Sequence, residues 1–155
     1  LIPCAEMAAF AKSGSDCLPA AVRAARAHTG RMHVLYQAYH GWHDWFAARI
    51  LNRPGLPHES SKHLRHFPYN DLATLEELLA TAEGGVAAVV LEPMNFEPPH
   101  EGYLAGVREL CTKHGALLVF DELWTWYRLA RGGAQEAYGV LPDFACYGKA
   151  LGNGM

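Results

Sequence analysis

The sequence predicts an α/β fold, with a mainly parallel sheet that carries helices on both faces. Two runs, "VAAVVLEP" and "ALLVFDE", are continuously apolar, as in strands that are buried on both faces. A segment with helical spacing of apolar residues precedes each run. Alternating helices and strands are typical of a parallel sheet, in which ligands lie beyond the carboxyl ends of the strands.

The first expected helix covers 15–29, where Ala, Val and Leu recur at helical spacing before Gly30, which suits a C-cap. A short apolar run follows at 34–37, and then the aromatic cluster "YHGWHDWF". The next stretch is polar and rich in Pro, Gly and His as far as Tyr69. This composition predicts a loop region over the surface.

The second expected helix covers 71–83, with leucines on one face and with Asp71 or Asn70 placed to cap it. The run "VAAVVLEP" follows as a strand. The segment "PHEGYLAGVRELCTKHG" predicts a third helix that ends at Gly115, before the strand "ALLVFDE".

Composition limits the possible functions. The 155 residues are half apolar and 19% charged, which suits one soluble globular domain. The net charge of −3 and the lack of a concentrated basic face argue against a nucleic acid partner. No apolar run approaches the ~18 residues that cross a bilayer, and no signal-peptide pattern opens the sequence. A cytoplasmic location is the expectation.

The four cysteines are scattered and form neither a C-x-x-C motif nor a Cys/His ligand pattern. They are Cys4, Cys17, Cys111 and Cys146. This spacing argues against a zinc site and against a disulfide framework, so reduced and mostly buried thiols are expected.

Glu92 and Asp121 end the two buried strands and are candidate site residues. Each candidate also has an ordinary structural explanation when it is taken alone. An Asp-Glu pair after a strand is common, "KSGSD" could bind an anion or form a tight turn, and Lys149 could be a surface lysine. No single motif decides between these readings.

Six motifs in order resemble the class III aminotransferases that depend on pyridoxal 5′-phosphate (PLP), especially the glutamate-1-semialdehyde aminomutase-like branch. They are "KSGSD", "YHGWHDW", "VVLEPM", "LLVFDELWTWYR", "GGAQEAYGVLPD" and "YGKALGNGM". The resemblance implies a fold-type I, aspartate aminotransferase-like large domain. Residues 1–155 would form its central part, without the N-terminal segment and the C-terminal small domain of such enzymes.

The resemblance implies that Lys149 forms a Schiff base with PLP and later moves a proton. Asp121 matches the aspartate that pairs with the pyridine nitrogen. A pyridinium would also compensate a carboxylate at the end of an apolar strand. Glu92 matches a strand-end glutamate near the cofactor, with a supporting role.

The remaining cofactor contacts are implied in the same way. Ser13, Gly14 and Ser15 match the phosphate-binding turn, where backbone N–H groups and a hydroxyl would bind the dianion. Tyr39 matches the aromatic residue that lies on the pyridine ring, and His40 belongs to the same motif.

Several residues depart from the family pattern. Trp124 stands where many relatives carry a glutamine that touches the cofactor's phenolic oxygen. Trp126 and Tyr127 replace a glycine and a phenylalanine, and Cys17 replaces an alanine. These departures leave the substrate open more than the cofactor.

The leading interpretation is PLP-dependent transamination between an amino donor and a keto or aldehyde acceptor, or intramolecular amino transfer. The family also implies a homodimer, or pairing with the missing chain segments. Two alternatives stay open at this point. The chain could be a truncated, non-catalytic homologue that acts as an interaction or assembly partner, or it could support other PLP chemistry such as racemisation.

Overall fold

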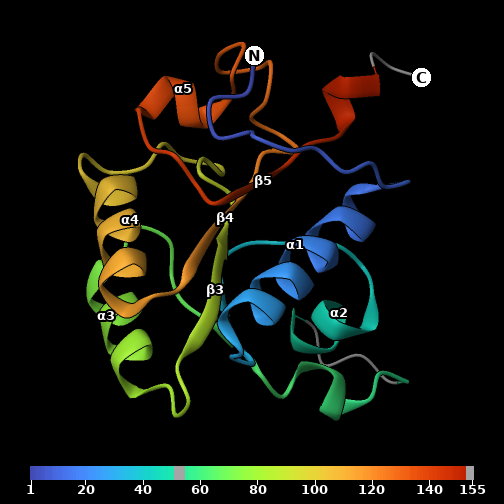
Figure 1. Ribbon diagram of the computed structural model, residues 1–155, viewed down its shortest axis with the longest axis vertical. Helices are drawn as coiled ribbons and strands as arrows, with labels where there is room; N and C mark the ends of the chain where they lie inside the picture. Colours follow the sequence, from blue (N-terminus) through green and yellow to red (C-terminus); the bar gives the residue numbers. More distant parts are fainter. Residues whose placement is uncertain (51–54, 153–155) are drawn as a thin grey trace.

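The computed structural model describes residues 1–50 and 55–152, and within them it forms one parallel sheet between two helical layers (Figure 1). The strand order is β2-β1-β3-β4-β5, and every neighbouring pair is parallel. The strands are β1 His33–Tyr36, β2 Leu64–His66, β3 Val86–Leu91, β4 Leu117–Asp121 and β5 Phe144–Cys146. The helices are α1 Gly14–Thr29, α2 Asp44–Ile50, α3 Leu72–Thr81, α4 Tyr103–His114 and α5 Ala134–Tyr138, with 3-10 turns η1 His58–Ser61 and η2 Lys149–Gly152.

The strand β3 contributes to a hydrophobic core on each face of the sheet. Val89 and Leu91 pack with side chains of α3 and α4, whereas Ala88 and Val90 pack with side chains of α1 and α2. Figure 1 shows α3 and α4 on one side of the sheet and α1 and α2 on the other. Because successive strand side chains point to opposite faces, a strand between two helical layers must be apolar throughout. The predicted fold class is confirmed.

The predicted helix ends agree closely with the structure. Gly30 caps α1 at a φ of 69°, and Gly115 caps α4 at a φ of 65°, both in the left-handed region that favours glycine. Asp71, and not Asn70, caps α3, because its Oδ1 accepts a hydrogen bond from the backbone N–H of Thr74 at 2.9 Å. The helix α3 ends at Thr81, two residues before the predicted end.

The predicted loop region before Tyr69 is wrong over most of its described length. The helix α2 extends into it, and η1 and the edge strand β2 follow. The strand β2 pairs with β1 through Val34 and Leu64, and only Leu64 of its three residues is buried. An edge strand with one buried side chain has no apolar run that could signal it. Residues 51–54 of this prediction lie outside the described part of the chain.

The four cysteines carry free thiols, of which Cys111 and Cys146 are buried and Cys4 and Cys17 are partly buried. Among the helices of the described residues, none is long and apolar enough to cross a membrane. The carboxyl ends of the parallel strands all meet one edge of the sheet, and the loops that leave this edge form the candidate site.

Candidate active site

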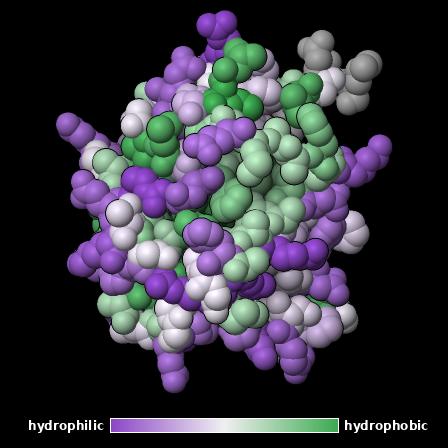
Figure 2. Space-filling view, viewed as in Figure 1, coloured by the Kyte–Doolittle hydropathy of each residue, from purple (hydrophilic) through white to green (hydrophobic). Residues whose placement is uncertain are grey.

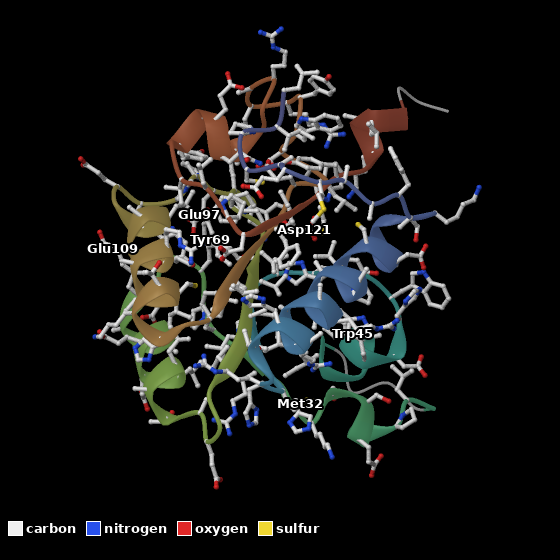
Figure 3. The ribbon with its side chains drawn as sticks, viewed as in Figure 1. Met32, Trp45, Tyr69, Glu97, Glu109 and Asp121 are labelled. Carbon is white, nitrogen blue, oxygen red and sulfur yellow. The ribbon has the colours of Figure 1, made fainter. Side chains whose placement is uncertain are left out.

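A cavity of about 310 Å³ opens at the carboxyl edge of the sheet, between α1 and the loops that follow β1, β3 and β4. All eight residues that the sequence singled out line it: Ser13, Gly14, Ser15, Tyr39, His40, Glu92, Asp121 and Lys149. Five further residues share the lining: Leu18, Gly41, Trp42, Leu123 and Trp124. Figure 3 shows Asp121 near the middle of the molecule, between the two helical layers.

The phase of the strands brings Glu92 and Asp121 together. Val90 and Val119 both face the core on the α1 side, and each carboxylate lies two residues further along its strand. The strands β3 and β4 are neighbours, with Leu91 opposite Phe120. Adjacent strands lie about 4.8 Å apart, so both carboxylates emerge side by side on the α1 face.

Asp121 is 4% exposed and is held by two hydrogen bonds. Its Oδ1 accepts the backbone N–H of Leu123 at 3.1 Å, and its Oδ2 lies 2.8 Å from Nδ1 of His40. The other ring nitrogen of His40 lies 2.6 Å from the backbone carbonyl of Gln37, which can only accept. Both ring nitrogens of His40 thus have partners, and the imidazole links the carboxylate of Asp121 to the backbone just after β1.

Glu92 is the second buried carboxyl of the cavity, at 9% exposed. Burial, and then the charge of Asp121, raise its pKa to about 7, while His40 and Lys149 oppose the shift. Near neutral pH, Glu92 therefore exchanges a proton readily and can either donate or accept a hydrogen bond.

Two glycines allow close approach of the segments around the first turn of α1. A Cβ on Gly14 would lie 1.9 Å from Cδ2 of Leu123, and a Cβ on Gly41 would lie 3.1 Å from the backbone Cα of Ser15. Gly41 also has a φ of 110°, which other residues rarely adopt. The loop after β1 therefore lies directly against the helix N-terminus, whose first N–H groups have no partner within the helix.

The serine hydroxyls of this turn have partners in the protein. The Ser13 hydroxyl donates to Oδ2 of Asp16 at 2.7 Å, and the Ser15 hydroxyl oxygen accepts the backbone N–H of Trp42 at 3.4 Å. The second contact ties the loop after β1 to α1, so Ser15 positions the turn as well as lining the cavity.

Tyr39 lies at the opening of the cavity and is 56% exposed. Its ring meets Phe46 of α2 edge-on, with centroids 6.1 Å apart. The preceding residue, Ala38, has a φ of 75° and turns the chain sharply at the end of β1. One face of the Tyr39 ring therefore stays available to a ligand.

Lys149 begins η2, lines the same cavity and has a φ of 45°. Its Nζ lies 4.4 Å from the centroid of the Trp124 ring. Partial burial lowers the pKa of Lys149, although Asp121 and Glu92 attract the ammonium and raise it. A lowered pKa increases the fraction of free amine, which is the nucleophilic form.

Glu122, the neighbour of Asp121, is fully buried but does not line the cavity. Its carboxylate accepts hydrogen bonds from the Thr125 hydroxyl and from the backbone N–H groups of Ala134, at 2.8 Å, and Gln135, at 3.1 Å. Glu122 thus fastens the loop of residues 123–133 to the start of α5. No role was predicted for Glu122, because its partners lie in an aperiodic loop and at the start of the short helix α5.

Comparisons with known proteins identify the family. The model of the class III aminotransferases matches residues 1–155, so the chain belongs to that family. It is 39% identical over 160 residues to the 3-aminobutyryl-CoA aminotransferase of Cloacimonas acidaminovorans, and 40% identical over 170 residues to the glutamate-1-semialdehyde 2,1-aminomutase of Syntrophobacter fumaroxidans. The matches cover 99% and 100% of this chain, and 38% and 39% of those proteins.

The fold agrees with solved structures. The FumI protein of Sphingopyxis sp. MTA144, described in its PLP internal aldimine form, matches with a TM-score of 0.90 and 32% identity over 99% of this chain. The match covers 38% of that protein. An omega-transaminase from Sphaerobacter thermophilus gives a TM-score of 0.87 at 28% identity, with 99% and 40% coverage. The chain therefore spans about two fifths of the length of these relatives.

Replacing Glu122 with Gln should destabilise the protein without altering the cavity lining directly. A glutamine amide would place an NH₂ group against backbone donors, so a loss of about 1–3 kcal/mol in the free energy of unfolding is expected. Urea denaturation measures this loss. Glu77→Gln, on the exposed face of α3, is the control and should change stability by less than about 0.5 kcal/mol. Equal stability of the two variants would contradict the anchoring role.

Glu92 should make stability fall as the pH rises. The pKa is raised from 4.5 to about 7, so the folded state binds the proton more tightly than the unfolded chain between these values. The contribution of Glu92 to stability is therefore fully present below pH 4.5 and is lost as the pH rises to about 7. Between these two pH values, the Tm of Glu92→Gln should fall by a few degrees less than the Tm of the wild type. A change of 1 kcal/mol shifts Tm by about 2–4 °C in a domain of this size.

The control for this measurement is Glu101→Gln, at an exposed position, which should keep the wild-type dependence of Tm on pH. A Glu92→Gln variant with the same dependence as the wild type would show that Glu92 does not titrate between folded and unfolded states as described.

Proposed function

We propose that this chain is the PLP-binding core of an aminotransferase or aminomutase. It would transfer an amino group from an amino donor to a keto or aldehyde acceptor, or between adjacent carbons of one substrate. The observation that carries this proposal is the meeting of Lys149, Asp121 and the N-terminus of α1 around one cavity. Membership of the class III aminotransferase family supports it.

The cavity fits the functional groups of PLP. The cofactor has an aldehyde, a pyridine nitrogen and a phosphate, which require an amine, a carboxylate and an anion-binding turn. Lys149 and Asp121 supply the first two, and the N–H groups at the start of α1 supply the third. A volume of about 310 Å³ suits a small cofactor.

When bound, PLP supplies an aldehyde that captures amines and a ring that withdraws electrons from the substrate carbon. Lys149 would hold the cofactor through Nζ and would later move a proton at the same atom. Asp121 would keep a proton on the ring nitrogen, and His40 would fix the orientation of this carboxylate. Tyr39 would cover one face of the ring, and Glu92 would supply a nearby proton.

Assembly with a second copy, or with further chain segments, is also part of the proposal. Met7 and Phe10 are 92% and 96% exposed in the N-terminal segment. Figure 2 shows apolar side chains gathered over the upper part of the visible face. Apolar surface of this kind suits burial against another part of an assembly. A cytoplasmic location is proposed on the unpaired state of the four cysteines.

A non-catalytic role in assembly is the competing function, and that exposed surface favours it. Incubation with PLP, reduction with borohydride and peptide mapping test the two. A pyridoxyl group on Lys149 is expected, with complete loss in Lys149→Ala and at least tenfold weaker PLP binding in Asp121→Asn, because a buried charge-assisted bond is worth about 1.5–3 kcal/mol. Lys62→Ala, at an exposed position, is the control. Absence of label on Lys149 would leave only the assembly role.

Gly41→Ala should weaken PLP binding by about tenfold, because a Cβ there forces the loop that carries Tyr39 and His40 away from α1. Gly139→Ala is the matched control. Gly139 also has a positive φ, of 67°, but a Cβ there meets nothing within 4 Å. The positive φ should cost both variants about 1–2 kcal/mol of stability, and Gly41→Ala should lose more because of its contact with Ser15. Only Gly41→Ala should lose affinity in a PLP titration. Equal affinities would contradict the close-approach role of Gly41.

A further inference from the structure

We propose that Trp124 is a positioning residue for Lys149, and that the face of its indole holds the lysine ammonium at the rim of the cavity. The inference rests on the proposed function, which gives the Lys149 amine its reaction. It adds a residue that acts through the lysine.

The contact itself has the geometry of a cation–π interaction. Nζ of Lys149 lies 4.4 Å from the centroid of the Trp124 ring, and Cζ of Arg128 lies 4.8 Å from it. Both distances fall within the range of about 6 Å in which the negative face of an indole attracts a cation. One aromatic ring therefore contacts two cations that come from different segments of the chain.

The indole is held in place independently of Lys149. The Arg128 guanidinium donates to the backbone carbonyl of Trp124 at 2.8 Å while its Cζ lies over the ring of the same residue. Two residues further on, the backbone N–H of Trp126 donates to the carbonyl of Glu122 at 3.1 Å. The buried carboxylate of Glu122 fastens the far end of this loop. Trp124 is thus a fixed surface on which a flexible side chain can rest.

Lys149 needs such a surface because its own backbone does not fix its amine. A lysine side chain has a flexible stem of four methylene carbons, and Lys149 lies in a short 3-10 turn and not in a long helix. Gly148, just before it, lies close to the Trp124 loop, because a Cβ on Gly148 would be 3.4 Å from Cγ of Leu123. The two segments are therefore neighbours at the backbone as well as at the side chains.

The charged and titratable groups that face Lys149 are Asp121, Glu92, Cys17 and Arg128. The acidic groups favour the ammonium, and Arg128 disfavours it. The Trp124 face also favours the ammonium, because the ring attracts a cation and not a neutral amine. Removing the aromatic face should therefore lower the pKa of Lys149, whereas merely admitting water to the cavity should raise it. The sign of the change separates the two causes.

Competitive labelling of Lys149 measures this change without activity. The cofactor-free protein is treated with trace acetic anhydride across a range of pH, and mass spectrometry gives the extent of acetylation at Lys149. In Trp124→Leu, which keeps apolar bulk without an aromatic face, the midpoint of labelling should fall by roughly half a pH unit. In Trp124→Phe, which keeps an aromatic face, the midpoint should stay close to the wild-type value. Trp42→Leu removes another indole that lines the cavity but takes no aromatic face from Lys149, so the midpoint should not fall.

An unchanged or raised midpoint in Trp124→Leu would overturn the proposal, as would equal shifts in the Leu and Phe variants. A second measurement keeps this failure distinct from failure of the proposed function. Borohydride reduction in the presence of PLP reports whether Lys149 takes the cofactor at all. A wild-type adduct with no change of midpoint in Trp124→Leu rejects the role of Trp124 alone, whereas no adduct in the wild type rejects the proposed function.

Discussion

The buried hydrogen bond between Asp121 and His40 is the constraint on which the site depends. A carboxylate at the end of an apolar strand is costly unless it is paired, and the 2.8 Å contact with His40 and the N–H of Leu123 pair it. The same contact joins the loop after β1 to the end of β4, across the intervening strand β3. Tyr39, which precedes His40 and lines the cavity, is therefore tied to the end of β4 through this bond.

Rigid elements hold the rest of the cavity. The two glycines, Gly14 and Gly41, let three segments meet at distances that side chains would prevent. Glu122 fixes the loop after β4 from the far side, through donors at the start of α5. The two adjacent acidic residues thus have different roles, because side chains alternate along the chain: Asp121 points towards the cavity and Glu122 points away from it. The carboxylate that binds nothing in the cavity is the one that keeps the loop in place.

The sequence predicted what depends on local pattern. The strands β3 and β4 are buried on both faces, so their apolar runs identify them, and the capping residues Gly30, Asp71 and Gly115 follow from local chemistry. The strand β2 could not be predicted, because an edge strand buries only Leu64 and its pairing is decided by a distant neighbour. The eight residues that the motif resemblance singled out all line one cavity. Leu18, Trp42 and Leu123 also line it, but they could not be predicted, because nothing in their local sequence indicates a site.

The charges around the cavity favour an anionic ligand. The carboxylate of Asp121 lies against His40, with Oδ2 2.8 Å from Nδ1. Glu92 is partly protonated near neutral pH, because burial and the neighbouring Asp121 raise its pKa to about 7. The ammonium of Lys149 and the positive end of the α1 dipole both favour an anion in this cavity. A phosphate near α1 would reduce this positive potential and would favour the protonated form of Glu92 further. Glu92 and Asp121 can therefore lie side by side, because only one of the two carboxyl groups needs to be charged.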